Sequence, residues 1–227
     1  AAAQFLDVFR VRQIQVISFD PSQAADLEER LFEKIVIDEP VAQAVADAAE
    51  ASAEAGAPVL APASLPEGYA LVEFSVSAPR RARAWVDLEA AAALLESAGL
   101  PIDVIPADPD DRVISALIPA MVRQRYSAGD DSFAVVQVAS PEMSVPEGLD
   151  VERVGILGLR LLGYSAEEAT TLASSINWAT TLVLPVPTGA ASAEEVTVQG
   201  VNGFLLEDHQ SEDHTEATLV WEKDEVV

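Results

Sequence analysis

The stretch Val196-Thr197-Val198-Gln199-Gly200-Val201-Asn202-Gly203-Phe204-Leu205-Leu206 joins two short apolar runs through a segment that contains two glycines. Glycine and asparagine favour the backbone conformations of tight turns, so the pattern predicts two strands joined by a turn at 200–203. Leu182–Leu184 and Ala217–Trp221 are apolar runs of the same kind, and Lys223-Asp224 is a further predicted turn. This end of the chain is therefore expected to form a meander of antiparallel strands.

Helical patterns separate this meander from strands nearer the N-terminus. Asp150 begins a predicted helix that extends to Gly163, and Ser165 begins another through a Ser-x-x-Glu capping box. The same periodicities predict strands at 9–17, 71–77, 113–118 and 133–139, and helices from Asp20, from Pro40 to Gly56, and from Asp87 to Gly99. Because strands and helices come in runs, an α+β fold is predicted, with an antiparallel sheet backed by several helices. A finer form of this prediction is a sheet like that of lipoprotein carriers.

The composition indicates one large folded domain with an acidic surface. Half of the 227 residues are hydrophobic, and 38 Asp and Glu against 13 Lys and Arg give a formal net charge of −25. A single domain over 1–227 is expected, in which 1–57 supplies a strand and two helices and 58–227 supplies the main sheet and the other helices. Nucleic acid is excluded as a partner because binding it requires Lys and Arg to neutralise phosphates. The absence of Cys excludes disulfides and thiolate metal sites.

Several motifs resemble a known family. The first is Pro58-Val59-Leu60-Ala61-Pro62 with Leu65-Pro66-Glu67-Gly68-Tyr69, after an Ala- and Glu-rich helix; the others are Trp178–Pro187 with Glu195–Gly203, and the ending Leu219–Val227. They are similar to motifs of an uncharacterised extracytoplasmic domain that membrane-anchored, anti-sigma-factor-like regulators carry. The resemblance covers the chain from about Glu50 to its end. It is made of turns and core residues, so it implies a fold and carries no catalytic roles.

The resemblance also implies a location. A membrane anchor would precede the first strand, and the domain would lie outside the bacterial cytoplasmic membrane, tethered to it. The chain opens at Ala1 without Met, which favours an upstream segment. The family's last hairpin extends beyond the point where this chain ends, so the last strand is expected to be incomplete. The zinc-binding cytoplasmic module of anti-sigma factors needs paired Cys and is therefore not expected within these residues.

An acidic stretch between two predicted strands holds both histidines of the chain. His209 and His214 lie there together with the carboxylates of Glu207, Asp208, Glu212 and Asp213, and this set could bind a divalent metal or respond to pH. The two histidines are five residues apart, whereas a helix presents two imidazoles to one ion at a separation of four. A polar loop without metal is therefore favoured, and no cofactor is expected.

One basic cluster stands out in this acidic chain. Arg80, Arg81 and Arg83 lie close to Trp85. They would form a docking patch for an acidic partner, or an anion site in which Trp85 stacks on a guanidinium. The favoured alternative is that these arginines pair with the protein's own abundant carboxylates.

Three aromatic residues are candidates for a binding pocket. Tyr69, Trp178 and Trp221 would line a site for an apolar ligand, although packing in the core or at its rim is the favoured alternative. Gly155 and Gly158, in the helix predicted over 150–163, indicate a close-packing site between helices.

The expected function is non-catalytic. The chain is predicted to be a sensory or interaction domain of an anti-sigma-like transcriptional regulator, with a protein or an apolar ligand as its partner. The alternative is a periplasmic or cell-surface carrier of a hydrophobic ligand or lipoprotein. A hydrolase is the third hypothesis, and it is disfavoured because no Gly-x-Ser-x-Gly motif occurs.

Overall fold

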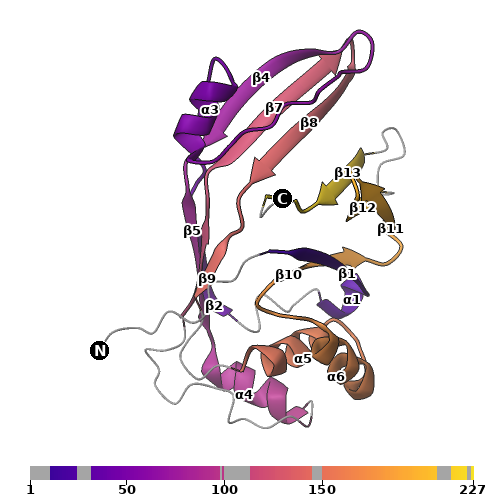
Figure 1. The fold of residues 1–227 in the computed structure, drawn as a ribbon. Coiled ribbons are helices and arrows are strands. Elements are labelled where there is room, and N and C mark those ends of the chain that lie inside the picture. Colours follow the sequence, from indigo (N-terminus) through magenta and orange to yellow (C-terminus); the bar gives the residue numbers. More distant parts are fainter. Residues whose placement is uncertain are drawn as a thin grey trace.

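The computed structural model describes residues 11–24, 32–97, 99, 113–144, 150–208, 216–223 and 226–227. The protein is α+β, as predicted, and its sheets are antiparallel except for one parallel pair of strands. Figure 1 shows a long bent sheet, a strand pair that lies beside two helices, and a short meander. Within the described ranges, no helix is long and apolar enough to cross a membrane.

The bent sheet has four strand positions, and the strand at each position is broken once. Its upper half has the strand order β3-β4-β7-β8 and its lower half the order β2-β5-β6-β9 (Figure 1). The strands are β2 (Phe32–Ile37), β3 (Ala42–Ala44), β4 (Ala70–Ser77), β5 (Arg80–Val86), β6 (Val113–Ile118), β7 (Met121–Ala128), β8 (Asp131–Val138) and β9 (Glu142–Ser144). The chain passes directly from β2 to β3, β4 to β5, β6 to β7 and β8 to β9, so the two halves form one antiparallel surface.

A proline lies at every break in this sheet. Pro40, Pro79, Pro119 and Pro141 occupy the four interruptions. Proline has no backbone N–H, so it cannot donate to the ladder and is rarely found inside a central strand. Four prolines in adjacent strand positions therefore explain why all four strands are interrupted at the same level.

Only part of this sheet was predicted. The apolar runs of β4, β6 and β8 were recognised, whereas β2, β5, β7 and β9 were not. Charged residues alternate with apolar or polar ones in β5 and β7, because one face of each strand is exposed. Residues 25–31, which include most of the helix expected from Asp20, lie outside the described ranges; α1 there is Pro21–Ala24.

The helix predicted from Pro40 begins later than expected. Residues 42–44 pair with β4, and α3 (Ala48–Ala55) begins after Asp47, whose carboxylate accepts hydrogen bonds from the backbone N–H groups of Ala49 and Glu50. The helix ends as predicted at Gly56, which has a φ of +68°. Ala51 of α3 packs with Val76 and Val122 of the upper half, so this helix covers one face of that half.

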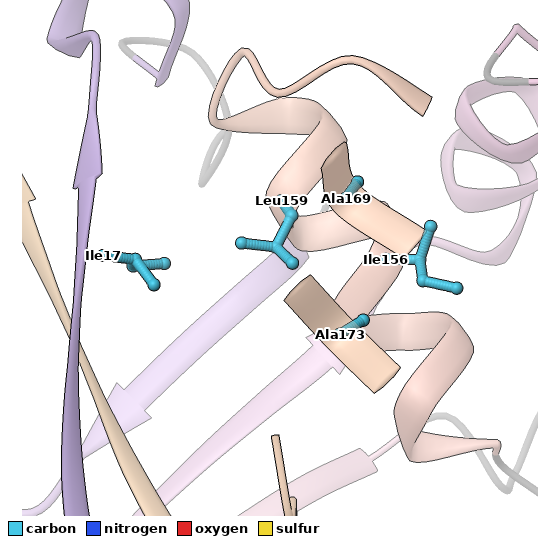
Figure 2. Packing of buried hydrophobic residues seen from close by; sticks show 5 residues of the cluster. All are labelled: Ile17, Ile156, Leu159, Ala169 and Ala173. Carbon is cyan, nitrogen blue, oxygen red and sulfur yellow. The ribbon is translucent and has the colours of Figure 1, made fainter. Parts of the chain in front are cut away.

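A second core lies between two helices and a parallel pair of strands. The strands are β1 (Gln13–Phe19) and β10 (Thr181–Pro187), and the helices are α5 (Val151–Leu161) and α6 (Ala166–Ser175). Figure 2 shows Ile17 of β1 facing Leu159, with Ile156, Ala169 and Ala173 beyond it. The prediction that 182–184 belongs to the antiparallel meander is wrong. These residues form a continuous apolar run, and such a run alone does not show which strand is its partner.

The two predicted helix starts in this core are confirmed. Asp150 accepts a hydrogen bond from the N–H of Arg153, and Ser165 forms the capping box with Glu168. Hydrogen bonds from the side chain and backbone of Ser165 lower the pKa of the Glu168 carboxyl. The remaining helix, α4 (Leu88–Ser97), follows Asp87, which caps it as predicted.

The last three strands form the predicted meander. They are β11 (Ala191–Val198), β12 (Val201–Asp208) and β13 (Glu216–Trp221), in the order β11-β12-β13. The turn lies at Gln199-Gly200 rather than at 200–203. Both turn residues have positive φ, +50° and +86°, as a two-residue hairpin of the favoured hand requires. Residues 201–203 pair instead with β11.

Residues 1–57 and 58–227 share elements of the same sheet. β2 and β3, from the first segment, pair with β5 and β4 of the second. The single-domain organisation over 1–227 stays a prediction.

Candidate functional site

The basic cluster near Trp85 lies on the lower half of the bent sheet. Arg81 and Arg83 are exposed on β5 and alternate with Ala82 and Ala84, so they share a face with Trp85. The neighbouring strand β2 adds Lys34, which the sequence analysis did not connect with this site. Its Nζ lies 5.3 Å from the centre of the Trp85 ring, and Arg83 Cζ lies 5.9 Å from it. We call Lys34, Arg81, Arg83 and Trp85 the basic patch.

Arg80 does not belong to the basic patch. It stands opposite Ile118 in the register of β5 and β6, and it alternates with Arg81 along the strand. Adjacent residues of a strand point to opposite faces of the sheet, so the predicted three-arginine cluster is divided between two faces.

The arginines of the patch do not pair with carboxylates of the described residues. The ion pairs seen there are Arg125–Glu73, at 3.3 Å, and Arg153–Asp150, at 3.2 Å. The guanidinium groups of Arg81 and Arg83 have no carboxylate oxygen within 4.0 Å in this part of the chain, so the predicted pairing of these side chains with the protein's own carboxylates is not seen there. One carboxylate does lie close by, because Asp38 accepts a hydrogen bond from the backbone N–H of Arg81 at 3.1 Å. The guanidinium groups of Arg81 and Arg83 thus have no ion-pair partner among the described residues, although the protein has a net charge of −25.

The opposite face of the lower half is mostly apolar, with Arg80 at one end beside Ile118. Ile35 and Ile37 of β2 are exposed to 38% and 56%, and Met143 of β9 to 44%. The register places them in rows with small and aliphatic residues of the central strands, none of which is fully buried: Ala82, Ala84, Ile114, Ala116 and Ile118. We call these eight residues the apolar face.

The three candidate pocket aromatics lie in separate places. The Trp178 indole packs in the core of α5 and α6, where its Nε1–H donates to the carbonyl oxygen of Ala173 at 3.0 Å. Tyr69 contacts Phe133 of β8, with the ring centres 5.3 Å apart, and Trp221 stands opposite Gly203 in the meander. No ring contact links the three in the described residues, so they do not form one pocket there.

Two glycines of α5 differ in their surroundings. A Cβ on Gly155 would overlap the ring of Trp178, whereas a Cβ on Gly158 would meet nothing within 4 Å. The predicted close packing is therefore present at Gly155, but its partner is the Trp178 side chain instead of a helix.

The acidic stretch is only partly described. His209, Glu212, Asp213 and His214 lie outside the described ranges, whereas Glu207 and Asp208 end β12. These two residues help to line an open hollow of about 330 Å³, together with Pro187, Ala190, Ala191, Leu206 and Thr218. Over the ranges that the structure describes, no group of three or more acidic or histidine side chains could hold a metal ion.

A buried polar group on the upper half was not found from sequence. Gln124 of β7 is 1% exposed; its amide donates to the carbonyl of Leu60 at 2.9 Å and accepts from the Tyr126 hydroxyl at 2.5 Å. Burial raises the pKa of that hydroxyl. The Pro58–Tyr69 segment is thus held on the sheet by specific hydrogen bonds. The signal that the sequence offers for this is that Gln124 alternates with Val122 and Tyr126, the two buried residues on either side of it in β7.

The lower half of the bent sheet therefore carries the basic patch on one face and the apolar face on the other. Lys34 and Arg83 form cation–π contacts with the Trp85 ring. Their positive charges could bind anionic groups. No protein-family model matches the chain, and no curated protein or solved structure is significantly similar to it.

Proposed function

We propose that this chain is a non-catalytic interaction domain that docks an acidic partner on the basic patch. The observation that carries the proposal is the pair of exposed arginines beside Trp85, Arg81 and Arg83, whose guanidinium groups have no ion pair among the described residues of a strongly acidic protein. Long-range repulsion opposes the approach of an anion to such a molecule, so binding requires local contacts of this kind.

The proposed setting is the extracytoplasmic part of a membrane-anchored, anti-sigma-like regulator. Only the resemblance of the sequence motifs supports this setting. Protease treatment of intact cells that produce the full-length protein tests it: the domain should be digested from outside, and protection until the membrane is opened would contradict it.

The docking proposal is tested with poly-L-glutamate as a defined acidic polymer. We expect binding at low salt, followed by isothermal titration calorimetry, and weakening as salt screens the contact. Arg81→Glu should weaken binding about tenfold or more, because it replaces an attractive contact by a repulsive one. Arg80→Glu is the matched control, since it makes the same change of charge one residue away on the opposite face.

Two results would contradict docking on the patch. One is equal weakening by Arg80→Glu and Arg81→Glu, which would indicate a general effect of net charge. The other is absence of measurable binding to the unmodified protein at low salt.

The apolar face supports a second candidate, a carrier of hydrophobic ligands with the fold expected of lipoprotein carriers. Exposed Ile35, Ile37 and Met143 on one side of the sheet are the observation that favours it. A fluorescent fatty acid should then bind saturably, and Ile37→Asp should abolish binding. An Ile37→Asp variant that binds like the unmodified protein would remove this candidate.

A further inference from the structure

The proline breaks do not shift the register of the bent sheet. Ser77 is opposite Met121 above the break, and Arg80 is opposite Ile118 below it, so both strands have the same number of residues between these pairs. The other two pairs of neighbouring strand positions also keep one register on both sides of the break. Alternate residues of each strand position therefore share one face from the lower half to the upper half.

The burial of Ala120 supports this continuity. Ala120 lies in the break between β6 and β7, and it packs in one cluster with Val76, Val122 and Ala51 of α3. By alternation it shares a face with Val122 in the upper half and with Ile118 in the lower half. The face that α3 covers thus continues into the apolar face. The opposite face of the upper half continues into the face that carries the basic patch.

Two arginines of β7 lie on the same face as the basic patch. Arg123 and Arg125 are exposed and alternate with the buried residues of that strand. Arg125 is paired with Glu73 at 3.3 Å, whereas the Arg123 side chain has no ion pair among the described residues. Arg123 therefore adds to this face a positive charge that the upper half does not neutralise.

Positive charges outnumber negative ones on this face. Of the 13 basic residues of the chain, the register assigns five to it: Lys34, Arg81, Arg83, Arg123 and Arg125. The described carboxylates that share it are Glu73, Asp38, which is bonded to the Arg81 backbone, and Glu142 on the edge strand β9. Acidic residues outnumber basic ones nearly three to one in the whole chain, so this face is the part of the sheet that attracts an anion.

The spacing of the arginines matches that of side chains on an extended peptide. Arg81 and Arg83 are alternate residues of one strand, about 7 Å apart, as are alternate residues of any extended polypeptide. Arg123 is opposite Ser75, which precedes Arg83 by eight residues. Eight residues of a straight strand measure about 27 Å, and the bend shortens this path. A peptide of about ten residues can therefore place carboxylates against both halves.

We propose that the acidic partner of the basic patch is an extended polypeptide segment that crosses the proline breaks, with acidic residues at alternate positions that reach Arg123 as well as Arg81 and Arg83. The inference rests on the proposed function, because it identifies the partner of the same patch. An acidic polysaccharide is disfavoured, since the two-residue spacing of Arg81 and Arg83 is that of peptide side chains.

The test compares blocked peptides of alternating glutamate and threonine, ten and four residues long, titrated into the full chain at low salt and followed by NMR. Ten extended residues span about 30 Å and reach both halves, whereas four span about 10 Å and reach one. Both peptides should shift the Nε–H signals of Arg81 and Arg83, and only the longer one should also shift that of Arg123. A ten-residue peptide with its five glutamates consecutive should bind about two- to fivefold more weakly than the alternating one, because some of its carboxylates point away from the sheet.

Protein variants separate the two halves of this face. Arg123→Gln should weaken the alternating ten-residue peptide about two- to fivefold, the effect of one exposed ion pair, and leave the four-residue peptide unchanged. Arg81→Gln should weaken both peptides. Arg80→Gln is the matched control, because it removes the same charge from the opposite face and should change the binding of neither peptide.

Three outcomes would overturn the inference. The first is unchanged binding of the ten-residue peptide in Arg123→Gln, and the second is equal binding of the alternating and consecutive peptides. The third is tighter binding of pentagalacturonate, which carries the same five carboxylates and would identify an acidic polysaccharide as the partner.

Failure of this inference is distinguishable from failure of the proposed function. Binding of the ten-residue peptide that depends on Arg81 but not on Arg123 would refute only the path across the breaks. Absence of binding by both peptides and by poly-L-glutamate would refute docking on the basic patch, and this inference with it.

Discussion

Gly155 is the position at which α5 makes room for the indole of Trp178. A Cβ there would overlap the ring, and the ring is fixed by its hydrogen bond to Ala173 and by the surrounding core. We therefore expect Gly155→Ala to lower the free energy of unfolding by about 1–3 kcal/mol, the usual cost of overpacking a core. Urea denaturation followed by circular dichroism measures this change.

Gly158 provides a control in the same helix. Its Cβ would meet no atom within 4 Å, so Gly158→Ala should raise the free energy of unfolding by about 0.5–1 kcal/mol through the helix propensity of alanine. Both substitutions replace glycine by alanine in the same helix. If they change the free energy of unfolding in opposite directions, the difference is due to the contact with Trp178. Stabilisation by both would show that the indole moves aside at little cost.

At the scale of the element, we expect the row of prolines to determine where the sheet bends. Pro79 and Pro119 interrupt the two central strand positions, so replacing both by Val restores two backbone N–H donors where the ladders stop. We expect the sheet to straighten. Because the chain has no Cys, spin labels placed through Ser132→Cys and Ser144→Cys report the distance between the halves without interference. That distance should lengthen toward about 40 Å, the span of twelve extended residues.

Pro62→Val is the control for this experiment, since Pro62 precedes β4 and lies outside the sheet. It should leave the distance distribution of the labels unchanged. An unchanged distribution in the Pro79→Val and Pro119→Val double variant would assign the bend to packing instead, for example to the contact of Val11 with Ser140 at the break between β8 and β9.

The same elements show what sequence reasoning could and could not find. The sequence predicts the helix caps at Asp150 and Ser165 and the strands that are continuous apolar runs. Both kinds of feature are determined by residues that are close together in the chain. Partner choice depends on residues far apart in the chain. Nothing within β10 indicates that it pairs in parallel with β1, and nothing near Trp85 indicates that β2 brings Lys34 to its ring. The prolines were visible, but their alignment needs the register of four strands.

For the whole molecule, net charge governs stability and binding in opposite ways. With 38 acidic and 13 basic residues, folding gathers like charges at the surface. Raising NaCl from about 0.01 M to about 1 M shortens the screening length from about 30 Å to about 3 Å and weakens this repulsion. We expect Tm to rise by at least about 2–4 °C, which is about 1 kcal/mol for a chain of this size, as measured by scanning calorimetry.

The salt response should depend on the number of exposed carboxylates. A triple variant, Glu54→Gln, Glu167→Gln and Glu194→Gln, removes charge at three exposed positions on separate elements and should have a higher Tm at low salt and a smaller rise with NaCl. A Tm that falls as salt increases would mean that attractive ion pairs outweigh repulsion. Binding of an acidic partner to the basic patch should weaken over the same range of NaCl concentration. Added salt should therefore stabilise the folded protein and at the same time release the acidic partner.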